Sequence, residues 1–499
     1  MQQIKIALSA TLFLIALLPA GRLLSQANQP VLIDAWITTA DRSMLFEKQK
    51  DSIKLFAGNN GWGPTIVIDD KQSMQTMDGF GFALTGGSAG LIVKMSPAAR
   101  TSLLQQLFGA DGTNAGVSYI RLTIGASDMN SFVFSYDDMP KGETDPELKK
   151  FSLAQDLKDV VPVMKEILAI NPTIKILASP WSAPTWMKTN EAAKKGFLKK
   201  DYYPVYAQYF VKYIQAMKQQ GIPVDAITIQ NEPLNANNTP SMPWHAADAA
   251  AFIKTNLGPA FKAAGISTKI ILFDHNCDRP DYPLLILNDP EAAQYVNGSG
   301  FHHYAGDMSA LNTLHLARPD KDLYFTEQMV IEDAGSKELN IAEPVKDLII
   351  EAPRNWSKNV LLWNLAADPL NGPHTDDGGC PMCQGAITID GNNVSWNIAF
   401  YAIKHASKFV RPGSVRIAST YPGDITVALS SDEEQSSVMR AMLVKNNDLL
   451  PNVAYKTPAG KIVLIVANDK TQEQYFRIQY NGMTANLKLA AGAVGTYTW

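Results

Sequence analysis

The stretch Ile227-Thr-Ile-Gln-Asn231-Glu232-Pro233 joins a short apolar run to polar side chains and a proline. Buried strands of parallel sheets have such apolar runs, and a proline, which has no backbone N–H, cannot continue a central strand. We therefore predict a strand over Ala226–Gln230 with Asn231 and Glu232 at its carboxyl end. In α/β barrels this end of each strand carries the residues that do chemistry.

Seven further apolar runs between Asp78 and Ser407 have the same character, and amphipathic stretches separate them. One such stretch, Leu157–Leu168, has apolar residues at helical i, i+3, i+4, i+7 spacing. Eight strand–helix repeats over this length predict a (β/α)8 TIM barrel of class α/β, with a doubly wound sheet as the alternative. The other predicted strands are Phe80–Leu84, Ser118–Ile124, Ile174–Ser179, Lys269–Phe273, Gly300–Tyr304, Leu323–Thr326 and Asn359–Leu365.

The pattern changes beyond Arg411-Pro-Gly413, where short strand-like runs alternate with turn residues and no helical period is present. This predicts an all-β sandwich, which the extended segments Ala35–Thr39 and Thr65–Asp69 complete from the N-terminal side. The predicted C-terminal strands are Val415–Thr420, Ile425–Leu429, Val438–Val444, Lys461–Val466, Tyr475–Tyr480 and Gly495–Trp499. The expected domains are a signal peptide (1–27), N-terminal sandwich strands (28–75), the catalytic barrel (76–408) and the C-terminal sandwich (409–499).

The composition excludes several classes of protein. Of the 499 residues, 44 are Lys or Arg and 48 are Asp or Glu, a formal charge of −4, and 46% are hydrophobic. A disordered chain has fewer apolar residues and a larger net charge. A nucleic-acid-binding protein usually has a basic excess. We therefore expect a globular protein that does not bind nucleic acid.

The first residues have the features of an export signal. Lys5 precedes an apolar run from Ile6 to Leu18, and the small residues Ser25 and Ala27 place a cleavage site before Asn28. The run is shorter than the roughly 20 apolar residues of a spanning helix, although an uncleaved anchor is the alternative. We expect a secreted or periplasmic protein without stable membrane insertion after signal removal.

The chain has three cysteines, too few for a disulfide scaffold. Cys380 and Cys383 form a single C-x-x-C pair, for which a local disulfide in an exported protein is favoured over zinc. His374 lies nearby in the sequence, but we expect no metal site. Cys277 is expected to be a buried free thiol.

Two glutamates occupy predicted strand ends: Glu232 ends the fourth strand, and Glu327 ends the seventh. Hydrolysis of a glycoside needs two carboxyl groups that flank the scissile bond. Desolvation at an apolar strand end raises the pKa of a carboxyl, which suits a proton donor. A lone glutamate at such a place is more often part of a salt bridge or a helix cap, so the pair carries the prediction.

Aromatic and polar residues near the other predicted strand ends fit a sugar site. Aromatic faces cover the apolar faces of sugar rings, and polar neighbours bond the hydroxyl groups. Any one of these residues alone is as well explained by the protein core. The aromatic candidates are Trp181, Trp186, Trp244, Trp363 and Tyr304, and the polar candidates are Arg121, Asp128, Asn190, His302 and Asn364.

Four motifs, in this order along the chain, resemble glycoside hydrolase family 30, whose animal member is lysosomal glucosylceramidase. The resemblance runs from about residue 75 through the C-terminal sandwich. It implies a barrel with a sandwich built from both chain ends, and double displacement with retention of configuration. The motifs are Asp78-Gly-Phe-Gly81, Ser179-Pro-Trp181-Ser-Ala-Pro-Thr-Trp186-Met-Lys-Thr-Asn190, Gln230-Asn-Glu232-Pro233 and Phe325-Thr-Glu327.

The resemblance also implies residue roles. Glu232 matches the acid/base and Glu327 the nucleophile, and Asp128 matches an aspartate that binds outer sugar hydroxyls. The loop Gly378-Gly-Cys-Pro-Met-Cys-Gln-Gly385 is similar to bacterial members rather than to lysosomal enzymes. The residues that match the pocket around the reacting sugar are Trp181, Asn231, His302, Tyr304 and Trp363.

The expected function is a secreted retaining β-glycosidase that acts on β-glucosidic bonds of a carbohydrate or glycolipid and needs no cofactor. A glucosylceramidase-like substrate is the first expectation, and an endo-β-1,6-glucanase of the same family is the alternative, with a β-xylanase third. From another class, a non-catalytic carbohydrate-binding protein on the same scaffold remains open. The sequence does not predict the oligomeric state.

Overall fold

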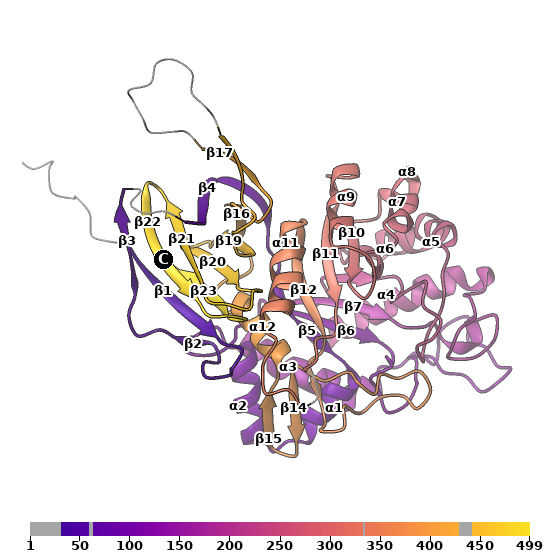
Figure 1. Cartoon of the computed structure of the whole chain (residues 1–499). Helices are drawn as coiled ribbons and strands as arrows, with labels where there is room; N and C mark the ends of the chain where they lie inside the picture. The colour runs from indigo at the N-terminus through magenta and orange to yellow at the C-terminus, as the bar shows by residue number, and fades with distance from the viewer. Residues whose placement is uncertain (1–30, 59–62, 333–334, 429–441) are drawn as a thin grey trace, which may run out of the picture.

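The computed structural model describes residues 31–58, 63–332, 335–428 and 442–499 (Figure 1). The expected signal peptide, residues 1–27, lies outside these ranges. Within them, no helix combines the length and apolar character that crossing a membrane requires.

Eight parallel strands close into a barrel, so the TIM-barrel prediction is confirmed and the doubly wound alternative is wrong. Each predicted strand is present, with ends shifted by a few residues. The barrel strands are β5 (Gly79–Leu84), β6 (Tyr119–Ile124), β7 (Lys175–Pro180), β8 (Ala226–Thr228), β9 (Lys269–Asn276), β10 (Gly298–His302), β11 (Asp322–Glu327) and β12 (Ser357–Asn364).

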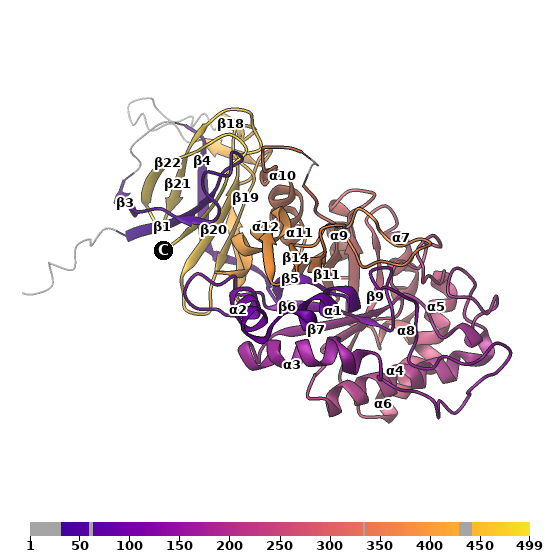
Figure 2. The same ribbon diagram turned by 90° about the horizontal axis from the view of Figure 1, so that it is seen from below.

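Helices cover the outside of the barrel, as Figure 2 shows from below. Two π-helical segments, Ile253–Leu257 and Val345–Ile350, continue α5 into α6 and α10 into α11. The helices are α1 (Gly86–Lys94), α2 (Pro97–Phe108), α3 (Val160–Ile170), α4 (Tyr203–Gln219), α5 (Ala246–Phe252), α6 (Gly258–Ala263), α7 (Asp281–Leu287), α8 (Pro290–Ala293), α9 (Ser309–Ala317), α10 (Ala342–Pro344), α11 (Glu351–Arg354) and α12 (Ile398–Ser407).

A small sheet follows the last barrel strand. It consists of β13 (Ala366–Ala367), β14 (Ile387–Asp390) and β15 (Asn393–Trp396), and β13 pairs with β14 in parallel. The loop between β13 and β14 contains both cysteines of the C-x-x-C pair. Because β13 begins two residues after the carboxyl end of β12, this loop leaves the barrel at the end where active sites of this fold lie.

The accessory all-β module contains strands from both chain ends, as predicted (Figure 1). Its ten strands follow the order β2-β1-β23-β20-β19-β16-β4-β21-β22-β3, and β1 also pairs with β3, which joins the two edges. These strands are β1 (Val31–Thr38), β2 (Glu47–Lys48), β3 (Ile53–Ala57), β4 (Thr65–Thr76), β16 (Val415–Ser419), β19 (Asn452–Lys456), β20 (Ile462–Ala467), β21 (Gln474–Tyr480), β22 (Met483–Leu489) and β23 (Val494–Thr498).

The sequence patterns missed four strands of this module: β2, β3, β19 and β22. Met483–Leu489 has only a weak alternation of apolar and polar residues, and its strand form depends on antiparallel pairing with β21. The hairpin β17 (Ile425–Ala428) and β18 (Met442–Lys445) covers parts of two predicted strands. The remaining predicted strand residues there, Leu429 and Val438–Arg440 with Ala441, lie outside the described residues.

A buried histidine links α12 to the sandwich. His405 is fully buried, with Nε2 2.8 Å from Thr38 Oγ1 and Nδ1 2.8 Å from Thr496 Oγ1. The Thr496 hydroxyl donates to the carbonyl oxygen of His405 and therefore accepts from Nδ1–H, which leaves Nε2 to accept from Thr38. These bonds satisfy a neutral imidazole, and burial lowers the pKa of His405 to about 3.

The His405 contacts predict acid sensitivity of the folded state. The unfolded chain binds a proton at this imidazole below about pH 6.5, whereas the folded protein does not until about pH 3. The free energy of unfolding therefore decreases as the pH falls through this interval. In His405→Gln the decrease between pH 7 and pH 4, measured by urea denaturation, should be smaller by up to about 3 kcal/mol. His245→Gln, at an exposed position, is the control and should keep the wild-type pH dependence.

Candidate active site

A cavity of about 400 Å³ lies at the carboxyl ends of the barrel strands. This volume lies within the range of small-ligand sites. Both predicted catalytic glutamates line it. The lining residues are Asp128, Glu232, Leu234, Asn235, Asn238, His275, Asn276, Tyr304, Glu327, Met329, Trp363, Cys380 and Cys383.

Glu232 follows β8 in an unusual backbone conformation. Strand β8 ends at Thr228, two residues earlier than predicted, and Glu232 has a φ of 46°, a region that non-glycine residues rarely adopt. Its backbone N–H donates to the carbonyl oxygen of Asp274 over 3.0 Å. Such strained residues are frequent at functional sites, because the surrounding structure must hold them. Here the turn brings the carboxyl group of Glu232 into the cavity.

Glu327 is the last residue of β11 and is 6% exposed. Its Oε2 accepts a hydrogen bond from Arg121 Nη1, with which it also forms an ion pair. Its Oε1 accepts from the Tyr304 hydroxyl over 3.0 Å. Burial raises the pKa of Glu327, whereas the charges of His302 and Arg121 act in the opposite direction.

The two glutamates converge. One carboxylate oxygen of Glu232 and one of Glu327 lie, together with a ring nitrogen of His302, within 4.8 Å of one another. The three side chains come from consecutive or near-consecutive strand ends of the closed barrel. The structure therefore brings together the two carboxyl groups that the sequence singles out.

A buried polar layer supports this pair from inside the barrel. Arg121 Nη2 donates to Asp274 Oδ2 and to Asn231 Oδ1, each over 2.7 Å, and Arg121 Nε donates to Ser179 Oγ. Asp274 also accepts from the Thr228 hydroxyl over 2.8 Å. The Arg121 side chain is fully buried, so its charge depends on these partners.

The sequence patterns missed Asp274, since the predicted strand ended at Phe273. A bulge makes the difference: Gly300 on β10 lies opposite Phe273, whereas the next residue, Phe301, lies opposite His275. Phe273 and Asp274 both have positive φ, 70° and 56°. The extra residue changes which side chain faces the barrel interior. A carboxylate directly after an apolar run was the available signal.

His302 lies between two carboxylates. Its Nδ1 is 3.1 Å from Glu232 Oε1, and its Nε2 is 3.0 Å from Asp274 Oδ1. Burial opposes protonation, but the charge of Glu327 and the hydrogen bonds to Asp274 and Glu232 raise the pKa of His302 to about 9. At neutral pH the ring is therefore protonated and donates from both nitrogens.

This imidazolium overturns the simple expectation that burial raises the pKa of Glu232. Burial does act in that direction, but the hydrogen bond and the charge of His302 outweigh it and lower the pKa to about 2. The amide of Asn235 contributes, since its Nδ2 donates to Glu232 Oε2 over 2.7 Å. At neutral pH Glu232 is thus a carboxylate beside a protonated histidine.

The other side of the cavity combines aromatic rings with a buried acid. Trp363 lines the cavity and stacks on the buried Trp181, which does not line it, with ring centroids 5.3 Å apart, and the Arg121 guanidinium lies 4.9 Å from the Trp181 ring centre. Asp128 is 6% exposed, and its Oδ1 has no hydrogen-bond partner in the described part of the chain. Burial and the charges of Glu327 and Glu232 raise the pKa of Asp128 to about 8.

Four predicted residues lie elsewhere. Trp186 and Trp244 are buried in the core around the barrel, where each packs against tyrosines. Asn190 is exposed and donates to the carbonyl oxygen of Lys194. Asn364 is buried and accepts from two hydroxyl groups of the β5–α1 connection. None of the four lines the cavity, although each lies next to motif residues or at a strand end in the sequence.

Residues that no sequence pattern identified, from the loop after Pro233 and from the end of β9, complete the cavity next to Glu232. The sequence shows no periodicity in the segment after Pro233, and only the fold brings it beside the end of β9. Asn238 Nδ2 lies 3.3 Å from Glu232 Oε2, and His275 Nδ1 accepts from the backbone N–H of Leu234. The polar residues on this side are Asn235, Asn238, His275 and Asn276.

The structure joins Cys380 and Cys383 in a disulfide, with 5.4 Å between their Cα atoms. Cys277 is a buried free thiol. Glu232, His302 and Glu327 have the spacing of a metal site. However, both nitrogens of His302 are engaged with the carboxylates of Glu232 and Asp274, and Arg121 pairs with Glu327, so a cation is disfavoured.

Known proteins are similar to this chain over most of its length. The model of the glycosyl hydrolase family 30 TIM-barrel domain matches residues 77–410, and that of the family 30 beta sandwich domain matches residues 413–497. An endo-1,6-beta-D-glucanase of Neurospora crassa is 34% identical over 449 residues, which cover 87% of this chain and 90% of that protein.

The solved structure of the endo-beta1,6-glucanase BT3312 has a TM-score of 0.80 at 31% identity and covers 94% of this chain and 99% of that chain. The lysosomal acid glucosylceramidase of Mus musculus is 27% identical over 474 residues, which cover 89% of this chain and 85% of that protein. The endoglucanases are thus more similar to this chain than this glucosylceramidase is, which favours the alternative substrate expectation over the first one. The chain belongs to glycoside hydrolase family 30 and is a glycosidase that hydrolyses the glycosidic bonds of carbohydrate substrates.

Proposed function

We propose that this protein is an exported endo-β-1,6-glucanase that acts by double displacement with retention of configuration. Glu327 is the nucleophile, and Glu232 is the general acid and base. The observation that carries the mechanism is the separation of the two carboxyl groups. Retaining enzymes hold them about 5–5.5 Å apart, and inverting enzymes about 6.5–9.5 Å apart. Oxygens within 4.8 Å of one another support the retaining class.

The surroundings of the two glutamates support different roles. The Arg121 guanidinium pairs with Glu327, and the Tyr304 hydroxyl donates to it, and both interactions favour a carboxylate that is ready to attack. Glu232 instead shares a proton with His302 across the 3.1 Å contact. The two groups titrate as a coupled pair, in which the proton can reside on either partner.

The reaction follows from these positions. Glu327 attacks the anomeric carbon while Glu232, having taken the proton shared with His302, gives it to the leaving oxygen. Glu232 then removes a proton from water, which attacks the same carbon and releases Glu327 and the sugar. Configuration inverts twice and is therefore retained.

On the Glu327 side, the cavity has aromatic and polar groups that can bind the sugar ring. Trp363 lines it and presents an aromatic face that suits the apolar face of a pyranose. The unpartnered Oδ1 of Asp128 is available to a sugar hydroxyl group, since a buried polar atom without a partner costs free energy. Asn231, which Arg121 holds in place, and the hydroxyl of Tyr304 lie next to the reacting centre.

The leaving group must lie beside its proton donor, Glu232. Three amides and an imidazole line the cavity there, with Leu234 as the aliphatic exception. Such polar groups suit the hydroxyls of a second sugar better than the hydrocarbon chains of a lipid. The similarity to two endo-1,6-beta-glucanases points in the same direction. A glucosylceramidase-like substrate is therefore the second candidate, and a non-catalytic binding protein is disfavoured because both glutamates are in place.

Export is part of the proposal. The basic and apolar N-terminal segment has the composition of a signal peptide. A disulfide is also typical of proteins that function outside the reducing cytosol.

The substrate is tested by assaying β-1,6-glucan, glucosylceramide and xylan side by side with the same protein. We expect hydrolysis of β-1,6-glucan to oligosaccharides, with the β-anomer as the first product in proton NMR spectra. Glu327→Gln should lower kcat by about 10⁴-fold or more, since it removes the nucleophile. Equal rates for wild type and Glu327→Gln, or an α-anomer as first product, contradict the mechanism. Preferential hydrolysis of glucosylceramide contradicts the substrate proposal alone.

The shared proton predicts a pH effect of His302. The wild-type pair keeps its proton to alkaline pH, because the surrounding carboxylates raise the pKa of His302 to about 9. In His302→Asn only the Glu232 carboxyl can hold this proton. The basic limb of kcat/KM should therefore move to lower pH by about one unit or more. His303→Asn, which alters the neighbouring imidazole outside the carboxylate cluster, serves as the control, and an unchanged limb in His302→Asn would exclude the shared proton.

A further inference from the structure

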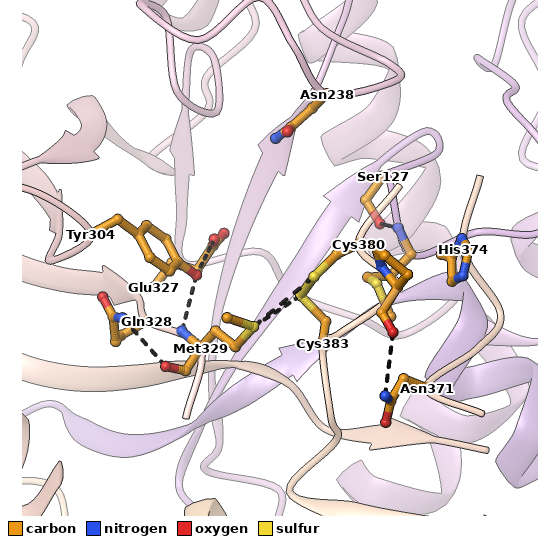
Figure 3. The surroundings of a disulfide bond; sticks show 12 residues. Ser127, Asn238, Tyr304, Glu327, Gln328, Met329, Asn371, His374, Cys380 and Cys383 are labelled. Atoms are coloured by element: carbon orange, nitrogen blue, oxygen red, sulfur yellow. Dashed lines mark hydrogen bonds between the residues drawn. A yellow bond between two sulfur atoms is a disulfide. The ribbon is translucent and has the colours of Figure 1, made fainter. Parts of the chain in front are cut away.

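The disulfide between Cys380 and Cys383 lies in the wall of the active-site cavity. It closes a loop of only four residues, and such a short cross-link could stabilise a loop anywhere on the protein. Cys380 and Cys383 both line the cavity that contains Glu232 and Glu327. Cys383 is 4% exposed and belongs to a buried cluster with Trp181 and Trp363. Figure 3 shows the disulfide beside Met329, with Tyr304 and Glu327 beyond it.

Met329 connects the disulfide to the reacting centre. Its Sδ lies 3.3 Å from Cys383 Sγ and 4.0 Å from Cys380 Sγ. Neither disulfide sulfur carries a proton, so these are packing contacts between polarisable sulfur atoms. Met329 is the second residue after Glu327, beyond the end of β11, and strand pairing therefore does not hold it.

The backbone of Met329 bonds to the tyrosine that contacts Glu327. The Met329 N–H donates to the Tyr304 hydroxyl oxygen over 2.9 Å, and that hydroxyl donates to Glu327 Oε1 over 3.0 Å (Figure 3). A phenol has a single proton, so an incoming N–H directs that proton towards the carboxylate. The position of Met329 therefore sets the direction of the Tyr304 bond to Glu327.

Hydrogen bonds hold the cysteine loop to the barrel on both sides of the disulfide. Before it, the backbone N–H of Thr375 donates to the Asp128 carbonyl oxygen over 2.9 Å, and the Thr375 hydroxyl donates to the Thr239 carbonyl oxygen over 2.8 Å. After it, Gln384 Oε1 accepts from the backbone N–H of Glu332 over 3.1 Å. Between these anchors, the disulfide closes the four residues from Cys380 to Cys383 into a compact turn against Met329.

We propose that the Cys380–Cys383 disulfide and Met329 form a positioning unit for Glu327, which acts through the Tyr304 hydroxyl. The unit rests on the proposed role of Glu327 as the nucleophile and deepens it. Without the disulfide, the turn is free to move away from Met329, and the Met329–Tyr304–Glu327 chain of bonds loosens. Because the unit orients the attacking carboxylate, it acts on the chemical step rather than on substrate binding alone.

The double variant Cys380→Ala/Cys383→Ala tests the proposal. With β-1,6-glucan as the substrate, we expect kcat to fall by about 10- to 100-fold, as for other small misplacements of reacting groups. Weakening the Tyr304 hydrogen bond disfavours the charged form of Glu327, so the acidic limb of kcat/KM should move to higher pH. If the disulfide only stabilises the fold, its removal lowers the unfolding temperature but leaves kcat and the acidic limb unchanged at 25 °C, and this result overturns the proposal.

Reduction of the folded wild-type protein gives the same test, and in this case the protein has already folded with its disulfide intact. Dithiothreitol supplies two electrons, opening the S–S bond to two thiols while it closes to its own cyclic disulfide. Titration of thiols in the native protein reports the extent of reduction. The reduced wild type should have the kcat of the double variant and recover on reoxidation, and the double variant should not respond to dithiothreitol. Full reduction with unchanged kcat also overturns the proposal.

Matched variants distinguish the role of the Met329 side chain from nonspecific effects of substitution on kcat. Met329→Ala should reproduce the loss of kcat, whereas Met329→Leu, which keeps the volume, should retain part of it. Met382→Ala removes an exposed methionine between the two cysteines, and Cys277→Ala removes the free thiol; both should have wild-type kinetics. Absence of β-1,6-glucan hydrolysis by the oxidised wild type contradicts the proposed function, whereas an active wild type with equally active variants contradicts only the positioning unit.

Discussion

A guanidinium that is fully shielded from water stands at the centre of this active site. Arg121 forms ion pairs with Asp274 and Glu327 and bonds to Asn231 and Ser179, while Trp181 and Trp363 lie over it. A buried charge is costly unless its partners satisfy it, and removal of one partner from such a pair typically costs about 3–5 kcal/mol. Five strands of the barrel, β6, β7, β9, β11 and β12, contribute to this cluster. The barrel must therefore close with the correct register before the charges can be satisfied.

The same cluster distributes charge between the two glutamates. Arg121 and protonated His302 supply two positive charges, and Asp274, Glu232 and Glu327 supply three negative ones. Asp274 contacts both cations, with Oδ2 on Arg121 and Oδ1 on His302. It therefore couples the environment of Glu327 to that of Glu232 although it faces neither substrate nor solvent. This arrangement explains why two glutamates on one cavity wall are suited to different tasks.

The surroundings of the barrel hold this centre in place from two directions. At the mouth, the loop between β13 and β14 brings a disulfide against Met329, beside the Tyr304–Glu327 hydrogen bond. On the far side, α12 carries His405 into bonds with both ends of the chain, Thr38 of β1 and Thr496 of β23. The sandwich is thus joined to the barrel by a neutral imidazole, whereas the active site depends on a charged one. The difference arises because His405 faces hydroxyl groups and His302 faces carboxylates.

Much of this protein was predictable from local sequence. Eight apolar runs separated by amphipathic stretches determined the barrel, because buried parallel strands need continuous apolar residues. Polar residues directly after those runs identified Glu232, Glu327 and Asp128, because strand ends in a barrel converge. Asp274 also follows such a run directly, but its inward direction could not be predicted, because the bulge that turns it arises from pairing between β9 and β10. Likewise, the low pKa of Glu232 depends on His302, 70 residues away in sequence. Apolar patterning is a property of neighbouring residues, whereas charge states and side-chain directions depend on contacts that exist only after the barrel has closed.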